Sequence, residues 1–147
     1  MASLEWALLG PALSGAGILA ADQISKYFAL SRSHPVAVTA ARPFLAIHCI
    51  VNKRGALLPL ARRPLRIAAF VLCIAFALVA LMQEPLMRNA WGATGIGIAL
   101  GGIVGNFIDL LRRGGVIDFI AVGRLSIFNI ADLAIVGGLA LALWALV

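Results

Sequence analysis

Aspartate is the residue type whose positions in this sequence most directly suggest chemistry. The 147-residue chain has four aspartates, and each lies in a long apolar segment or in the short link between two of them: Asp22, Asp109, Asp118 and Asp132. Ionisable side chains are costly in such segments and by default mark a functional pathway or site. Two carboxyl groups a few ångströms apart resist joint ionisation and tend to share one proton. The sequence therefore contains the groups needed for acid–base catalysis by a carboxyl pair.

The composition indicates what surrounds these carboxyl groups. Hydrophobic residues make up 63% of the chain and charged residues 12%, and the mean hydropathy is +1.04. A soluble domain has about half its residues apolar, so one globular core could not bury this much apolar surface. We therefore expect a single integral membrane domain over residues 1–147. The net charge of +6 arises mainly from short loops beside apolar segments, which favours contact with membrane lipid headgroups and no nucleic acid.

Four segments are long enough to cross a bilayer, which takes about 20 helical residues: 6–30, 65–82, 91–111 and 127–147. Pro11 interrupts the first, and the third carries Gly97, Gly101 and Gly105 on one face, which lets helices approach closely. The loop 31–63 contains two β-leaning runs, at 36–39 and 44–51. We predict an all-α membrane protein of four transmembrane helices with a small extramembrane β-containing loop.

If these segments run antiparallel, the aspartates meet at one membrane face. Asp22 lies toward the end of the first segment, Asp109 ends the third, and Asp132 lies near the start of the fourth. Three asparagines fall at the same face: Asn52, Asn106 and Asn129. The topology therefore predicts one convergent polar site.

Polar clusters follow one another in a distinctive order: Asp22-Gln-Ile-Ser-Lys26, Asn52-Lys-Arg-Gly55, Gly105-Asn106-Phe-Ile-Asp109, Val116-Ile-Asp118-Phe119 and Phe128-Asn129-Ile-Ala-Asp132. Asp-Gln-x-x-Lys alone would be a weak signal, whereas the last three clusters together are a strong one. The series resembles the lipoprotein signal peptidase family, also called signal peptidase II. The resemblance runs from Asp22 to Asp132, which is most of the chain.

The resemblance implies an aspartic endopeptidase with four transmembrane helices in the bacterial cytoplasmic (inner) membrane, with its active face and β-containing loop extracytoplasmic and with no metal or cofactor. Its substrate would be a prolipoprotein whose cysteine bears a diacylglyceryl group, cleaved just before that cysteine to release the signal peptide. By position in the motifs, Asp118 and Asp132 would be the catalytic pair. Supporting or substrate-binding residues would be Asp22, Lys26, Asn52, Gly55, Asn106, Asp109 and Asn129. A monomer is expected.

The sequence departs from the family pattern in four respects. One extra residue separates Asn52 from Gly55, and Leu110 stands where an arginine usually follows the aspartate of Gly-Asn-x-x-Asp. No basic tail follows the last apolar segment. Most basic residues would also lie at the active face, although positive charge usually favours the cytoplasmic side. The motifs take precedence in our expected orientation.

Other interpretations of the same residues remain open. Asn129 and Asp132 could form a helix N-cap with a first-turn carboxylate, and Asp22 and Lys26 could be a self-contained pair one helical turn apart. Asp118 could neutralise a nearby arginine. A catalytically lapsed relative that binds lipidated peptides or lipid is the alternative function. A proton or ion carrier is disfavoured because the aspartates gather at one face, and serine-hydrolase and zincin motifs are missing from the sequence.

Overall fold

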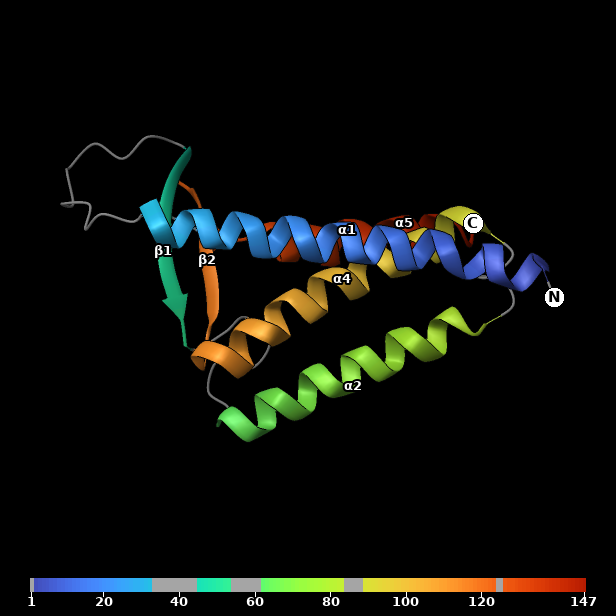
Figure 1. Ribbon diagram of the computed structural model, residues 1–147, viewed down its shortest axis with the longest axis horizontal. Helices are drawn as coiled ribbons and strands as arrows, with labels where there is room; N and C mark the ends of the chain where they lie inside the picture. Colours follow the sequence, from blue (N-terminus) through green and yellow to red (C-terminus); the bar gives the residue numbers. More distant parts are fainter. Residues whose placement is uncertain (1, 33–44, 54–61, 84–88, 124–125) are drawn as a thin grey trace.

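The computed structural model describes residues 2–32, 45–53, 62–83, 89–123 and 126–147. Within these residues the chain forms helices and a small sheet (Figure 1). In chain order the elements are α1 (Ala2–Arg32), β1 (Leu45–Asn52), α2 (Arg63–Leu81), α4 (Ala90–Arg113), β2 (Val116–Val122), β3 (Ser126–Phe128) and α5 (Ile130–Trp144).

Helix α4 is the centre of the bundle. It packs against α1, α2 and α5, and its C-terminal end meets β2. The helices run along the long axis of the molecule with the sheet at one end, whereas α1 begins and α5 ends at the opposite end (Figure 1). The C-terminal end of α1, the C-terminal end of α4 and the start of α5 therefore meet beside the sheet, as the antiparallel arrangement predicts.

Glycines allow the backbones of α1 and α4 to lie in direct contact. A Cβ atom on Gly101 would lie 2.3 Å from the carbonyl oxygen of Gly15, and one on Gly97 would lie 2.3 Å from that of Pro11. The predicted close approach at these two glycines is confirmed. Pro11 does not interrupt the first helix, because α1 continues through it.

The outer surfaces of the helices carry large apolar side chains. Leu72 and Phe76 of α2 are 69% and 75% exposed, and Val136 of α5 is 70% exposed. Within the described residues, α2 and α4 are long and apolar enough to cross a membrane, and α5 is apolar but shorter. Length and composition thus support two of the four predicted transmembrane helices.

The chain is mostly helical as predicted, and the sheet extends beyond the predicted β-containing loop. Strand β1 confirms the β-leaning run at 44–51, whereas the run at 36–39 lies outside the described residues. The central strand β2 and the edge strand β3 come from the link before α5, where no strand was predicted. Gly114, with a φ of 72°, ends α4, and Asn129 caps α5. The last helix therefore begins at Ile130 and not at residue 127.

The strand register brings β1, which carries Asn52, beside β2, which carries Asp118. β1 and β2 are antiparallel, with Ile50 opposite Asp118 and Asn52 opposite Val116. Gly115 lets the strands meet here, because a Cβ atom on it would lie 2.8 Å from the carbonyl oxygen of Asn52. The sheet thus places the end of β1 beside the aspartate of β2.

We predict that Gly101→Ala destabilises the bundle by about 1–3 kcal/mol, because the added methyl group forces α1 and α4 apart. Thermal unfolding in detergent measures the effect. Gly17→Ala is the matched control, since a Cβ atom there meets nothing within 4 Å; it should leave stability unchanged or raise it by about 0.5–1 kcal/mol. Equal melting temperatures for Gly101→Ala and wild type would contradict this account of the interface.

Candidate active site

The ammonium group of Lys26 is the buried centre of the polar site. Lys26 is 1% exposed. Its Nζ atom lies 2.8 Å from Oδ2 of Asp22 and 2.7 Å from Oδ2 of Asp109, and it donates to Oδ1 of Asn106 at 2.8 Å. All three N–H donors of the ammonium are therefore used. Because Asp109 belongs to α4, Asp22 and Lys26 are not a self-contained pair within α1.

The two carboxylates around Lys26 extend the contacts to neighbouring elements. Oδ1 of Asp22 accepts a hydrogen bond from the backbone N–H of Ala131 at 3.0 Å, which satisfies a free amide in the first turn of α5. Asp109 accepts from the backbone N–H of Ile117 at 3.3 Å and from Nη1 of Arg113 at 3.2 Å. The Lys26 cluster thus joins α1, α4, α5 and β2.

Lys26 also fixes the orientation of the Asn106 side chain. An ammonium can only donate, so the amide oxygen of Asn106 must face it. The amide nitrogen then points the other way and donates to Oδ1 of Asp132 at 2.8 Å. Asn106 therefore presents a fixed N–H donor to the first carboxyl group of the proposed pair.

Asn129 is held in the same manner and serves the second carboxyl group. Its Oδ1 accepts from the backbone N–H of Asp132 at 2.9 Å, while the backbone N–H of Asn129 donates to Oδ2 of Asp132 at 3.3 Å. This reciprocal capping box confirms the N-cap interpretation. The Nδ2 atom of Asn129 is consequently free to face Oδ1 of Asp118, at 2.8 Å. Capping and site geometry therefore coexist in one residue.

Asp118 lies in β2 and is 4% exposed. Its second oxygen accepts from Nδ2 of Asn52 at 3.0 Å. Burial raises the pKa of the Asp118 carboxyl group, and the nearby charge of Asp132 raises it further; hydrogen bonds from Asn52 and Asn129 and the charge of Lys26 oppose the rise without cancelling it. Protonation is therefore easier at Asp118 than at an ordinary aspartate.

An apolar groove opens from these carboxyl groups. It has a volume of about 810 Å³ and receives side chains from α2, α4, α5 and the strands. Its polar lining residues are Asn52, Arg66, Asn106, Asp118 and Asp132. The remaining lining is apolar apart from Cys73, with Phe70, Phe76, Ile103 and Leu139 among it. The groove can therefore hold a ligand with a polar part at the aspartates and a long apolar part along α2.

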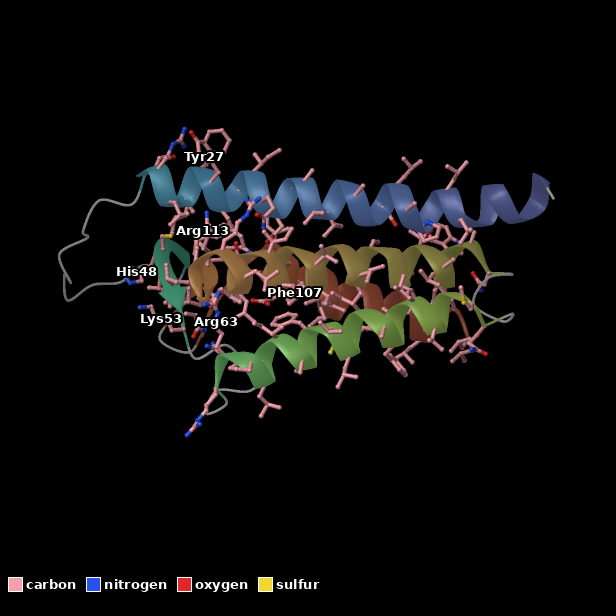
Figure 2. All side chains as sticks on the ribbon, turned by 60° about the horizontal axis from the view of Figure 1, so that its bottom comes forward. Tyr27, His48, Lys53, Arg63, Phe107 and Arg113 are labelled. Atoms are coloured by element: carbon pink, nitrogen blue, oxygen red, sulfur yellow. The ribbon has the colours of Figure 1, made fainter. Side chains whose placement is uncertain are left out.

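A ring contact holds α2 beside α4 near this groove. Phe70 of α2 and Phe107 of α4 stack with ring centroids 5.8 Å apart, and Phe107 lies between the two helices in Figure 2. Arg63, at the start of α2, donates to the carbonyl oxygens of Leu110 and Leu111 at 3.3 and 2.8 Å. One end of α2 is thus attached to the C-terminal end of α4.

The structure brings together eight of the residues singled out from the sequence: Asp22, Lys26, Asn52, Asn106, Asp109, Asp118, Asn129 and Asp132. Gly55 lies outside the described residues. The extra residue after Asn52 does not remove that side chain from the site. No group of three His, Cys, Asp or Glu side chains within the described part of the chain is arranged to hold a metal ion.

Three further residues contribute to the site, of which Gly105 was expected only as part of the glycine face of its helix, and Gln23 and Arg66 were given no role. Gly105 has no room for a side chain, because a Cβ atom would lie 2.5 Å from Oδ2 of Asp22. Gln23 donates to the same carboxylate at 3.1 Å and to the carbonyl oxygen of Gly105 at 3.2 Å. Arg66 lines the groove. The sequence held a signal for each: Gly105 precedes Asn106, Gln23 follows Asp22, and Arg66 precedes the apolar stripe of α2.

Comparison with known proteins agrees with the motif series. A family model described as "Signal peptidase (SPase) II" matches residues 15–147. The lipoprotein signal peptidase of Moorella thermoacetica is 30% identical over 135 residues, covering 88% of this chain and 87% of that protein. The lipoprotein signal peptidase of Dehalococcoides mccartyi is 36% identical over 122 residues, covering 79% and 74%.

Two solved bacterial membrane enzymes share the fold. The first has a TM-score of 0.77 and 25% identity, over 92% of this chain and 86% of that one. The second has a TM-score of 0.79 and 24% identity, over 93% and 92%.

We predict that Lys26→Met lowers the free energy of unfolding by about 3–5 kcal/mol, because two carboxylates are left buried without their common partner. Thermal or denaturant unfolding in detergent measures this loss. Ser25→Ala is the control, because the Ser25 hydroxyl donates to the backbone oxygen of Asp22 within the same helix. A Lys26→Met protein as stable as Ser25→Ala would show that the cluster does not hold the bundle together.

Proposed function

The chain belongs to the signal peptidase II family, and from this premise we propose that it is an aspartic endopeptidase that removes signal peptides from lipoprotein precursors. Its substrate is a precursor whose cysteine carries a diacylglyceryl group, and it cleaves the peptide bond just before that cysteine. One observation carries the assignment: Asp118 and Asp132 lie together at the polar end of an apolar groove. The family supplies the reaction, and this geometry supports the residues assigned to it.

The two carboxyl groups divide the acid and base work. Burial raises the pKa of Asp118 and so favours the shared proton there; Asp132 acts as the general base. Asp132 takes a proton from water as the water oxygen attacks the scissile carbonyl carbon. The C–N bond then breaks, and Asp118 supplies a proton to the leaving amine. The products are a signal peptide with a new carboxylate and a lipoprotein with a free amino group on its cysteine.

The asparagines make this arrangement rigid before substrate arrives. Each oxygen of Asp118 and of Asp132 accepts one N–H donor, from Asn52, Asn106 or Asn129. Fixed donors in a water-poor site need no reorganisation during reaction. They also hold the carboxyl groups in place while one proton moves between them.

The groove explains a preference for lipid-modified precursors. Apolar side chains line most of it, and its walls come from helices whose outer faces carry exposed apolar residues. An acyl chain can enter such a groove from the hydrocarbon region and remain out of water, which stabilises binding by about 0.8 kcal/mol per buried CH₂ group. The glyceryl-bearing cysteine is thereby drawn to the carboxyl pair.

We assign all four described helices as membrane spans. Helix α1 has 31 residues, which is about 46 Å at the α-helical rise. Helix α5 is shorter, with 15 residues, and its capped N-terminal end lies at the site. Exposed Trp91 and Trp144 lie at the end remote from the sheet and fit an interfacial aromatic belt; Tyr27, labelled in Figure 2, occupies the sheet end. We propose that the protein is a monomer in the cytoplasmic membrane.

In the orientation that we propose, the sheet and the carboxyl pair face the extracytoplasmic side, and both ends of the chain face the cytoplasm. The motif series supports it, although the basic residues near the sheet run against the usual positive-inside tendency. Accessibility of a terminal tag to a membrane-impermeant reagent tests it. Labelling of the tag only after the membrane is opened is the expected result, and labelling of sealed right-side-out vesicles contradicts the orientation.

A lapsed relative that only binds lipidated peptides is the second candidate, because Leu110 and the longer Asn52–Gly55 turn depart from the family pattern. Asn52 nonetheless donates to Asp118, which favours an active enzyme. Incubation with a diacylglyceryl precursor peptide separates the two, since a lapsed relative would bind the peptide and leave it intact.

We predict that Asp118→Asn and Asp132→Asn each lower the turnover rate by about 100-fold or more, because an amide cannot exchange the required proton. Both variants should remain folded, since asparagine keeps the size of the side chain and one of its two acceptor oxygens. Product formation from a diacylglyceryl precursor peptide and the melting temperature are measured together, with Ser31→Ala as a control at the exposed end of α1. Near-normal turnover in either aspartate variant would disprove the pair assignment.

We predict that Asn52→Ala moves the alkaline limb of the pH–rate profile to higher pH. The hydrogen bond from Asn52 lowers the pKa of Asp118; its removal raises that pKa, so the proton needed by the leaving amine is kept to higher pH. Maximal turnover should fall by roughly 10-fold as the carboxyl group loses a fixed donor. Lys53→Met is the neighbouring control and should keep the wild-type limb. A limb that stays in place or moves to lower pH contradicts the role of Asn52.

A further inference from the structure

Arg113 supplies a cation to Asp109 from the last turn of α4. Its Nη1 atom lies 3.2 Å from Oδ1 of that carboxylate, one helical turn away, as residues four apart on a helix can. Leu110, which stands where the family pattern has an arginine, is 1% exposed and lines the apolar groove. In this chain the position directly after Asp109 is therefore apolar, and the positive charge comes from Arg113.

The buried cluster around Lys26 has more negative than positive charge unless Arg113 is counted. Asp22 and Asp109 are both 0% exposed, and the single ammonium group of Lys26 pairs with both of them. Within the described residues, Arg113 provides the second positive charge, so that two cations balance two carboxylates. A buried charge left without a partner is strongly destabilising. Arg113 should therefore matter more than a cation in a fully exposed ion pair, which contributes little.

Asp109 connects this balance to the strand that carries Asp118. Because Arg113 takes its Oδ1 atom, the Oδ2 atom of Asp109 faces Lys26 at 2.7 Å and the backbone N–H of Ile117 at 3.3 Å. Ile117 directly precedes Asp118 in β2. A fixed Asp109 carboxylate thus holds the backbone from which the Asp118 side chain extends.

The same carboxylate is connected to Asp132 through Lys26. The ammonium group that pairs with Asp109 also donates to Oδ1 of Asn106, whose Nδ2 atom donates to Asp132 at 2.8 Å. Each step in this series is a contact to a charged group, and such contacts are the stronger hydrogen bonds. Both carboxyl groups of the proposed pair therefore depend on the position of Asp109.

We propose that Arg113 is a positioning residue of the site, which balances the charge of Asp109 and thereby holds Asp118 and Asp132 in their working geometry. Arg113 is not among the residues that line the groove, so this role needs no contact with substrate. The inference rests on the proposed function, because turnover of a precursor reports whether the carboxyl pair is correctly placed.

Arg112 offers a matched control on the same helix. Both arginines lie in the last turn of α4, where a positive charge is favourable beside the helix dipole. The side chain of Arg112 is exposed, and Arg113 lies at the sheet end of α4 in Figure 2. A loss at both positions would reflect the helix dipole or the surface charge, whereas a loss at Arg113 alone would reflect its contact with Asp109.

The first experiment measures kcat and KM on a diacylglyceryl precursor peptide. Arg113→Met should lower kcat by about 10-fold, because small displacements of reacting groups cost turnover. KM should change by less than about 2-fold, as expected for a residue that does not bind the substrate. Arg113→Lys keeps the charge one helical turn from Asp109 and should retain kcat within about 3-fold of wild type. Arg112→Met should behave as wild type.

The second experiment is a double-mutant cycle with Asp109→Asn. That substitution removes one negative charge, so that Lys26 is balanced by Asp22 alone and Arg113 has no carboxylate to hold. Adding Arg113→Met to Asp109→Asn should therefore change kcat by less than about 2-fold, in contrast to its effect in the wild-type protein. If Asp109→Asn is too slow to assay, the melting temperatures of the same four proteins complete the cycle, and the loss caused by Arg113→Met should again disappear.

Wild-type kcat in Arg113→Met, or an equal loss in Arg112→Met, would overturn the proposal. A rise in KM at unchanged kcat would also overturn it, because that result indicates a contact with the substrate. Equal effects of Arg113→Met with and without Asp109→Asn would show that Arg113 does not act through Asp109. A wild-type protein that leaves the precursor intact would instead contradict the proposed function, and the cycle in melting temperatures would still test the charge balance.

Discussion

A buried ammonium group that must be neutralised is the constraint on which the site depends. The ammonium group of Lys26 is buried with the carboxylates of Asp22 and Asp109 beside it, and an unpaired buried charge is far costlier than a paired one. That requirement fixes the rotation of α1 against α4. It also fixes the amide of Asn106, and so directs an N–H donor at Asp132. Charge compensation in the bundle thereby sets the geometry of the proposed catalytic pair.

The carboxyl pair lies where two kinds of structure meet. Asp132 is held by the first turn of the apolar helix α5, and Asp118 is held by the central strand of the sheet. Asn129 connects them, since it caps α5 and donates to Asp118. On one side of this junction lies the groove, lined mostly by apolar side chains, and on the other side lies the three-stranded sheet. A substrate that is a lipid at one end and a peptide at the other fits this division.

The sequence predicted the site better than it predicted the sheet. The aspartates, Lys26 and the asparagines could be placed together because their positions at the ends of apolar segments determine which face they share. The strands β2 and β3 were not foreseen, because Val116–Val122 directly follows a helix and its partner β1 is far away in the chain. The place of Arg66 in the groove depends on where α2 lies in space, and its position next to the apolar stripe of α2 was the one local signal of it. The role of Gly97 and Gly101 could be predicted because a helix face without side chains allows a neighbouring helix to approach closely.

The most direct test follows the oxygen atom that water contributes. The purified protein is mixed in excess with a diacylglyceryl precursor peptide in oxygen-18 water, and the products of a single turnover are weighed by mass spectrometry. Direct attack by water activated at Asp132 and Asp118 predicts cleavage just before the modified cysteine, with one oxygen-18 atom in the new carboxylate of the released signal peptide. An intact precursor, a cut at another bond or an unlabelled carboxylate from an aspartyl intermediate would contradict the account.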